Sequence, residues 1–467
     1  MLIKGEEVSD GILAEVINPY DGRVIDTIVE GGPEHVDAAV SAACNALRPM
    51  VELTAYERSQ LLFAAYQALG ARAEEFATAI CQEVGKTIRE ARGEVSRARQ
   101  VVRLSSEEAK RLCGEQLHLD GACNGAGKIG FTLRVPAGVV AAIVPFNFPI
   151  VLTAHKLCPA LAAGNTVVLK PPPQAPLAAC MFGQLLHEAG FPAGAVNVVP
   201  GGAQVGDALV RDERVRVVAF AGSDRTGEIV AQAAGMKKLL LECGSGSSVT
   251  VMPSADMEAA VAGCVRGSYA VAGQMCTSIQ KIFAQSELYD SFLAEFVERV
   301  KSLNVGDPRK ETTDIGPVID EAAAARLDSW IAEAQEQGAE LVIGGTRAGN
   351  LFAPTVLTGV TPEMKLFGDE VFGPVVSVIR IADVAEAIEL ANTTRHGLNT
   401  GIFTNRLDEA LAFVRGVDHG SVFVNEVPVW RADMMPYGGV KRSGIGPKCI
   451  KHAMDAMTEL KVVSIEI

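Results

Sequence analysis

The chain has 467 residues, of which 48% are hydrophobic and 21% charged, and its net charge at neutral pH is −14. This composition is typical of a globular protein long enough for two or three domains. An acidic surface repels phosphate backbones and anionic lipid headgroups, so neither nucleic acid nor a membrane surface is an expected partner.

The N-terminal segment has no apolar stretch of the secretory kind, and the ten cysteines include no C-x-x-C pair. We therefore expect a reduced, cytoplasmic protein whose thiols are mostly core residues. Seven scattered histidines predict no metal site. The longest uncharged run, residues 135–154, contains three prolines, and we interpret it as strand and loop rather than a membrane helix.

Residues 33–112 predict a series of helices, because apolar residues recur at intervals of three and four and Pro33 suits a first helical turn. Segment 116–135 resembles a Gly-rich β-hairpin. From residue 139 onward, short apolar strands alternate with helical segments, which predicts a parallel sheet with helices on both faces. The strand segments are GVVAAIVP, NTVVLKP, AVNVVPG, VRVVAFAG and KKLLLECG.

A second alternating block begins near residue 246 and includes AELVIGG, VVSVIRI, DVAEAIELANTT and GSVFVNE. Two α/β blocks predict two domains, and the cleft between domains is a usual place for a ligand. The last strand, KVVSIEI, has no partner in its sequence neighbourhood. Exposed strands of this kind often pair with another subunit, which favours an oligomer.

Three segments carry side chains suited to carbonyl chemistry. Cys276 in AGQMCTS can supply a thiolate nucleophile, although most cysteines are packing residues. Glu242 ends an apolar strand, where ligands gather in open α/β sheets, and can act as a general base or simply face water. Asn147, in the Pro-bounded VPFNFP, can donate to an oxyanion or form a turn.

Two further segments suit a phosphorylated cofactor. In FAGSDRTG, residues 220–227, Gly222, Ser223 and Gly227 join a strand to a helix whose backbone N–H groups can hold a pyrophosphate. The spacing differs from G-x-G-x-x-G, so this motif alone is weakly specific. Lys170, which ends TVVLK, can reach a ribose or phosphate, or be an ordinary surface lysine.

Taken in this order, the segments resemble the aldehyde dehydrogenase superfamily along essentially the whole chain. The likeness rests on PFNFP, KLCPALAAGNTVVLKP, FAGSDRTG, LECG, GQMCTS, EVFGPVV and MPYGGVKRSGIG. It implies an enzyme that uses NAD or NADP to oxidise a small-molecule aldehyde to a carboxylic acid through a thioester. It also implies a homodimer or homotetramer.

The fold implied by the resemblance is α/β, with two parallel-sheet domains. The division it implies is a Rossmann-like NAD(P)-binding domain at 1–115 and 136–244 and a catalytic domain at 245–450. An oligomerisation element would combine the β-hairpin at 116–135 with residues 451–467.

The resemblance also assigns roles to single residues. Cys276 matches the nucleophile, Glu242 the general base, and Asn147 the oxyanion-hole amide. Lys156 matches a lysine near the base that assists proton transfer. The positions expected at the cofactor are Val144, Phe146, Lys170, Gly201, Gly222, Ser223, Gly227, Glu370 and Phe372.

Some positions depart from the family pattern. Where the family usually has K-P-S-E, this chain has Lys170 followed by three prolines. Without that carboxylate a 2′-phosphate meets no repulsion and can pair with Lys170, so the sequence leaves NAD and NADP both open. Cys243, beside the base, is expected to be a packing residue. Residues 447–448 replace a common Arg-Glu pair, and we have no physical account of that change.

The substrate is less closely defined. WRADMMPYGGVKRSGIG resembles most the branch that contains lactaldehyde, glyceraldehyde-3-phosphate and phosphonoacetaldehyde dehydrogenases. Branch members with phosphate or phosphonate substrates tend to carry Arg before the nucleophile, where this chain has Met275, an apolar contact. Arg431 or Lys281 can contact an anion, although a surface position is favoured for Lys281. A small hydroxyaldehyde such as lactaldehyde, or a semialdehyde, is the expected substrate.

Three alternatives stay open at this point. A non-phosphorylating glyceraldehyde-3-phosphate dehydrogenase would need a site for the phosphate. A coenzyme A-acylating enzyme does not need a hydrolytic base, so the presence of Glu242 argues against it. A non-catalytic binding protein would not need Cys276, Glu242 and Asn147 together.

Overall fold

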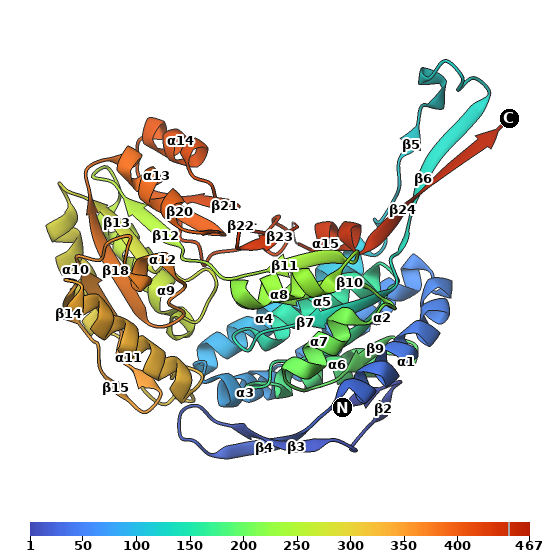
Figure 1. Cartoon of the computed structure of the whole chain (residues 1–467), viewed down its shortest axis with the longest axis horizontal. Helices are drawn as coiled ribbons and strands as arrows, with labels where there is room; N and C mark the ends of the chain where they lie inside the picture. The colour runs from blue at the N-terminus through green and yellow to red at the C-terminus, as the bar shows by residue number, and fades with distance from the viewer. Residues whose placement is uncertain (447–448) are drawn as a thin grey trace.

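The computed structural model describes residues 1–446 and 449–467, so the sequence departure at 447–448 lies outside the described residues. Two helix-covered sheets form the body, and a β-arm extends from it (Figure 1). Within the described residues, no helix is long and apolar enough to cross a membrane.

The larger sheet has eight strands in the order β2-β1-β9-β8-β7-β10-β11-β23. These are β1 (Leu2–Ile3), β2 (Glu6–Glu7), β7 (Val139–Ile143), β8 (Thr166–Lys170), β9 (Val196–Val198), β10 (Val215–Ala221), β11 (Lys238–Glu242) and β23 (Gly444–Ile445). The five strands β9, β8, β7, β10 and β11 run parallel. In chain order they follow the 3-2-1-4-5 arrangement of a Rossmann fold, as the sequence predicted.

Helices cover both faces of this sheet, which explains why its central strands are continuous apolar runs. Alternate residues of β7 enter two separate cores: Val140 and Ala142 enter one, and Val139 and Ala141 enter the other. The predicted helices at 33–112 are confirmed. The helices of this unit are α1 (Pro33–Glu52), α2 (Ala55–Ala71), α3 (Ala73–Val84), α4 (Ile88–Glu108), α5 (Pro149–Ala162), α6 (Leu177–Glu188), α7 (Ala203–Arg211) and α8 (Asp224–Ala234).

The second sheet has seven strands, ordered β14-β17-β18-β13-β12-β20-β21, and only β14 pairs antiparallel. Its strands are β12 (Ser248–Val251), β13 (Lys281–Gln285), β14 (Glu340–Ile343), β17 (Thr355–Thr358), β18 (Val375–Ile381), β20 (Asn399–Phe403) and β21 (Ser421–Val424). The associated helices are α9 (Met257–Tyr269), α10 (Tyr289–Lys301), α11 (Glu321–Glu336), α12 (Lys365–Gly368), α13 (Val384–Thr393) and α14 (Leu407–Gly416). The second α/β block is therefore confirmed.

The arm is a three-stranded antiparallel sheet in the order β24-β6-β5, with the C-terminus near its tip (Figure 1). It consists of β5 (Gln116–Leu117), β6 (Lys128–Pro136) and β24 (Thr458–Glu466). β5 and β6 form the expected hairpin. The last strand pairs along its length with β6, which is distant in sequence, so periodicity could not identify this partner.

The smaller elements complete the described chain. They are β3 (Ile12–Ile17), β4 (Val24–Glu30), β15 (Arg347–Ala348), β16 (Leu351–Phe352), β19 (His396–Gly397), β22 (Val440–Lys441), the 3-10 turns η1 (Leu119–Gly121) and η2 (Ala270–Gly273), and α15 (Ile450–Ala456). β23 pairs with β11, and α15 contributes to the core of the first unit. Both elements therefore pack on the Rossmann layer.

One local prediction was wrong. Residues 149–154, expected to be loop, form the first turns of α5. Pro149 occupies a first-turn position that proline tolerates well. The carboxylate of Glu94, from α4, accepts the N–H groups of Ile150 and Val151 at 3.0 and 3.2 Å. That cap comes from a distant helix, which is why the local sequence did not reveal it.

Candidate active site

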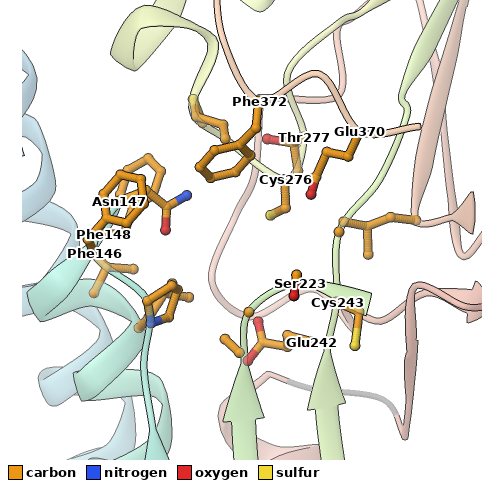
Figure 2. A pocket seen from close by; sticks show the side chains of 18 of the residues that line it. Phe146, Asn147, Phe148, Ser223, Glu242, Cys243, Cys276, Thr277, Glu370 and Phe372 are labelled. Carbon is orange, nitrogen blue, oxygen red and sulfur yellow. The ribbon is translucent and has the colours of Figure 1, made fainter. Parts of the chain in front are cut away.

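A cavity of about 360 Å³ opens where the carboxyl ends of β7, β10 and β11 face the second α/β unit (Figure 2). β7 and β10 flank the topological switch point of the Rossmann sheet, the usual ligand crevice of open α/β folds. Most of the predicted site residues line it: Phe146, Asn147, Gly222, Ser223, Glu242, Met275, Cys276, Glu370, Phe372 and Arg431. Val144, Lys156, Lys170, Gly201 and Gly227 are not among its lining residues.

Cys276 lies on a strained loop after α9. Val271 and Ala272 have φ values of 53° and 51°, a left-handed conformation that is unusual for a β-branched residue. Gly273 follows with φ 69°, and a Cβ there would lie 2.0 Å from the carbonyl oxygen of Gly373. Glycine is therefore required where the nucleophile loop crosses the EVFGP segment.

The thiol of Cys276 contacts the hydroxyl of Tyr437, with Sγ 3.4 Å from Oη. Burial raises the pKa of the Cys276 thiol, and the hydrogen bond from Tyr437 opposes that shift. Burial also raises the pKa of Tyr437 well above its usual value of 10, so its hydroxyl stays protonated. Tyr437 is thus a donor that favours the thiolate.

Asn147 is tied to the same loop. Its Nδ2 donates to the carbonyl oxygen of Gln274 at 2.8 Å, and the side chain is buried. An amide nitrogen has two N–H groups, so a second donor can point at a substrate oxygen. Gln274 lies two residues before Cys276, and Figure 2 shows the amide and the thiol on facing sides of the cavity.

Glu242 forms a buried ion pair with Lys156, in which Nζ lies 2.7 Å from Oε1. Burial, followed by the nearby charge of Arg431, lowers the pKa of Lys156 to about 7. A lysine so perturbed can exchange a proton near neutral pH. Next to Glu242, burial raises the pKa of the Cys243 thiol to about 12, as expected for a packing residue.

Several residues expected at the cofactor also line the cavity. Ser223 caps α8 through its Oγ, which accepts the N–H of Thr226 at 3.2 Å. The N–H of Gly222 donates to the carbonyl oxygen of Glu242 at 3.0 Å and is already engaged. The N–H of Gly222 is therefore not free to bind the pyrophosphate that the sequence predicted at this turn.

Glu370 and Phe372 shape the neighbouring wall. Oε1 of Glu370 accepts the N–H of Ser245 at 2.9 Å, and burial raises the pKa of this carboxyl to about 7. The rings of Phe372 and Phe146 meet edge to face, with centroids 5.9 Å apart. Phe372 has φ 47°, a left-handed conformation that sets its ring against the cavity. At this separation the two rings are in direct edge-to-face contact.

Two lysines that the sequence analysis singled out lie buried. Lys281 is fully buried, and its Nζ donates to the carbonyl oxygen of Phe367 at 2.8 Å, so its predicted surface position was wrong. Lys170 is also buried and donates to the carbonyl of Pro171 at 3.1 Å. Burial lowers the pKa of Lys170 to about 8. Both depend on the packing of distant elements, which sequence patterns do not report.

Sequence reasoning missed a charged cluster on the far side of Cys276. Arg97, from α4, makes a bidentate pair with Asp433, and His155 contacts the same carboxylate at 3.0 Å. The guanidinium of Arg431 stacks 4.0 Å from the ring centre of Tyr437, and its Nε has no hydrogen-bond partner. Tyr437 belongs to the MPYGG motif, but nothing in α4 distinguishes Arg97 from the neighbouring arginines.

Comparison with known proteins identifies the chain. A model described as the aldehyde dehydrogenase family matches residues 7–463. The chain belongs to this family. It is an oxidoreductase that acts on aldehydes with NAD or NADP, as the sequence predicted. Along 468 aligned residues it is 40% identical to 3-sulfolactaldehyde dehydrogenase of Priestia aryabhattai, covering all of this chain and 98% of that relative.

Solved structures agree with this assignment. The structure of aldehyde dehydrogenase 21 from Physcomitrella patens, in complex with the reaction product succinate, matches with a TM-score of 0.97 and 35% identity over 100% of this chain and 97% of that one. Glyceraldehyde-3-phosphate dehydrogenase GapN from Methanocaldococcus jannaschii, complexed with NADP, matches with a TM-score of 0.95 and 35% identity over 99% and 100%. This aldehyde dehydrogenase therefore has the family fold along its whole length.

Proposed function

We propose that this enzyme oxidises a short aldehyde that carries one negative charge, such as a carboxylate semialdehyde or a sulfonated aldehyde, to the corresponding acid. The observation that carries this proposal is the pair of guanidinium groups, Arg97 and Arg431, in the wall of the cavity that holds Cys276. Asp433 lies within ion-pair distance of both groups and balances one of the two positive charges, so a neutral aldehyde would leave the second charge unbalanced within this cluster.

The charges of the cluster indicate how much charge the substrate bears. Arg97 and Arg431 each contribute one positive charge, because a guanidinium group loses its proton only at very high pH. Burial alone would raise the pKa of Asp433, but hydrogen bonds from His155 and Arg97 outweigh it and hold that pKa low. Burial lowers the pKa of His155 to about 3, so this ring is neutral. Within this cluster of four side chains one net positive charge remains, which matches a substrate that carries one negative charge.

The same charge balance argues against a substrate with a doubly charged phosphate group, because one of its two negative charges would have no partner in the cluster. Met275, next to the nucleophile, adds no positive charge. The names of two relatives support the smaller anion: one acts on 3-sulfolactaldehyde, and another was solved with succinate. Of the two expected substrate classes, the charged semialdehyde is favoured over neutral lactaldehyde.

In the proposed reaction, the Cys276 thiolate adds to the aldehyde carbon and the carbonyl becomes an alkoxide. Asn147 donates its second N–H to this oxygen; one such donor typically contributes about 3–4 kcal/mol. A nicotinamide bound beside Cys276 would supply the hydride acceptor that conversion of the adduct to the thioester requires, and Phe146, Phe372 and Glu370 would hold it. Glu242 then removes a proton from water, which attacks the thioester, releases the acid and returns the thiol. Lys156 exchanges this proton with Glu242.

The cofactor fits the residues present. We propose that Phe146 and Phe372 hold the nicotinamide, Glu370 the adjoining ribose, and the start of α8 with Ser223 the phosphates. Val144, Lys170, Gly201 and Gly227 are proposed to shape the adenosine side, although none lines the cavity. The absence of a carboxylate after Lys170 supports acceptance of NADP alongside NAD.

Replacing Arg431 by Met tests the substrate class. The change removes the charge and keeps a long apolar side chain against Tyr437. We expect kcat/KM for succinic semialdehyde to fall about 10- to 100-fold, from the loss of one charge-assisted contact of roughly 1.5–3 kcal/mol. Butyraldehyde, of equal chain length, should change less than threefold, and Arg431→Lys should recover part of the loss. Equal losses for both aldehydes would refute the charged substrate.

Trapping the acyl-enzyme tests the catalytic roles. Glu242→Gln should accumulate a thioester, visible by peptide mass spectrometry as added acyl mass on Cys276 after one turnover. Cys276→Ala should abolish turnover, with folding and cofactor binding retained. Acid production by the parent without coenzyme A excludes the acylating alternative, whereas strict dependence on coenzyme A would support it. Full activity in either variant would remove the corresponding assignment.

We further propose that the enzyme is a homo-oligomer joined through the arm, and that its domains follow the division expected from the sequence apart from β23 and α15, which pack with the Rossmann unit. The outer edge of β24 pairs with no strand of the described chain, and Leu460 and Val462 on this strand are exposed. Unpaired edges of this length promote association. The division is supported by the separate cores of the two α/β units.

A further inference from the structure

Helix α4 turns one face toward the active site. Glu90, Glu94 and Arg97 follow one another at intervals of four and three residues, so they share one side of the helix. Arg97 reaches the cavity itself. The two carboxylates reach backbone N–H groups of other segments, and these segments carry the nucleophile and the oxyanion amide.

Glu90 holds the strained loop that leads to Cys276. Its Oε1 accepts the N–H of Val271 at 2.7 Å, while Oε2 caps α4 through Thr87 at 3.1 Å. Val271 is the β-branched residue with φ 53°. A conformation of this kind persists only when surrounding contacts enforce it. The carboxylate of Glu90 is such a contact, and it belongs to the Rossmann unit whereas Val271 belongs to the second unit.

Glu94 holds the oxyanion segment. Its Oε1 accepts the N–H groups of Ile150 and Val151, the first free donors of α5, which begins two residues after Asn147. Lys86 neutralises this buried carboxylate at 2.6 Å, with both side chains fully buried. The same ammonium lies 3.4 Å from the ring centre of Phe148, which directly follows Asn147. Glu94 and Lys86 therefore contact the chain on both sides of the turn between Asn147 and α5.

We propose that Glu90 and Glu94 are positioning residues that set the distance between the Cys276 thiol and the Asn147 amide. The two carboxylates are one helical turn apart on a rigid element. Each fixes one of two segments that otherwise belong to different α/β units. The hydrogen bond from Asn147 Nδ2 to the Gln274 carbonyl oxygen joins the two segments directly. The inference rests on the proposed roles of Cys276 and Asn147.

The chain contains a matched control. Glu83 is also fully buried, and its carboxyl group caps α6 by accepting the N–H groups of Leu177 and Ala178 at 2.6 and 2.9 Å; unlike the Lys86-paired Glu94, it has a pKa that burial raises to about 8. Neither Glu83 nor α6 lines the cavity. Loss of either carboxylate should destabilise the fold similarly, so only a positioning role predicts a selective effect on the chemical step.

The experiment compares Glu94→Ala with Glu83→Ala in the full-length enzyme. Three quantities are measured: the melting temperature, the pre-steady-state burst of reduced cofactor with the best aldehyde of the parent, and the alkylation rate of Cys276 by iodoacetamide. We expect both variants to melt earlier. The burst should slow about 100-fold or more in Glu94→Ala, the loss expected for one misplaced oxyanion donor, and less than threefold in Glu83→Ala. Alkylation should stay within threefold in both.

The double variant Glu94→Gln with Lys86→Met tests whether the burst can be restored when the buried charges are balanced. Glu94→Gln keeps an acceptor oxygen but leaves the charge of Lys86 unbalanced, and we expect its burst to slow about tenfold. Adding Lys86→Met removes that charge and should restore the burst to within threefold of the parent. This pair decides the question if Glu94→Ala does not fold. Equal slowing in the Glu94 and Glu83 alanine variants, or no recovery in the double variant, would overturn the proposal.

Glu90→Gln tests the other carboxylate. It should slow both the burst and the alkylation of Cys276 by about tenfold or more, because the strained loop loses its charged anchor. Unchanged alkylation would contradict the role of Glu90. Asn147→Ala, measured alongside, separates the two proposals. A normal burst there would contradict the function assigned to Asn147, while the comparison of Glu94 with Glu83 still decides the role of α4.

Discussion

At the scale of single residues, the reactivity of Cys276 depends on a neighbour that lies far away in the sequence. Burial alone keeps a thiol protonated, and a protonated thiol is a poor nucleophile. Tyr437 counteracts this effect by a hydrogen bond that favours the thiolate. Since Tyr437 itself does not ionise in the working range of pH, its contribution stays constant while Cys276 titrates.

Replacing Tyr437 by Phe should therefore raise the pKa of Cys276. In the parent enzyme the thiolate fraction of Cys276 grows as the pH rises toward the elevated pKa of this thiol. Without the Tyr437 hydroxyl, the same thiolate fraction is reached only at higher pH. We expect the pH profile of Cys276 alkylation to shift upward by about one unit, equivalent to roughly 1.4 kcal/mol. Tyr269→Phe is the control, because this buried hydroxyl donates to the Thr355 carbonyl instead. Superimposable profiles in parent and Tyr437→Phe would contradict the argument.

At the scale of elements, the arm and the catalytic cavity have separate tasks. The arm projects from the body (Figure 1), and none of the residues that line the cavity belongs to its strands. Subunit association through β24 thus need not supply any side chain to the site. This separation makes association testable without destroying activity.

The variant Leu460→Glu with Val462→Glu places like charges on the exposed strand β24. We expect the mass measured by light scattering during size-exclusion chromatography to fall to that of a smaller species. The specific activity should stay within about threefold, since no residue of the arm strands lines the cavity. Leu407→Glu, which changes a still more exposed leucine at the start of α14, should leave the mass unchanged. A monomeric parent would refute association through the arm.

At the scale of the whole molecule, two α/β units face each other across the cavity, and α4 ties one to the other. The Rossmann unit contributes Asn147, Glu242 and Lys156, and the second unit contributes Cys276 and Glu370. Gly273 permits the close crossing that brings the nucleophile loop against the EVFGP segment. The chemistry is therefore assembled from segments that lie far apart in the chain.

Much of this arrangement could be predicted from the sequence. The alternation of apolar strands and helices identified both sheets, because strand and helix periods depend on neighbouring residues. The position of Glu242 followed from the rule that ligands gather at the carboxyl ends of parallel strands, and Asn147 was proposed from its proline-bounded loop. Motifs in the family order located Cys276, Glu370 and Phe372.

Only the tertiary structure decided the rest. The convergence of Arg97, His155 and Asp433, the burial of Lys281 and the partner of the last strand all depend on which distant elements pack together. The start of α5 depends on a carboxylate from another helix. Local patterns encode backbone preference, whereas counter-ions, caps and burial are set by long-range packing, and in this enzyme that packing places the charges around the reacting thiol.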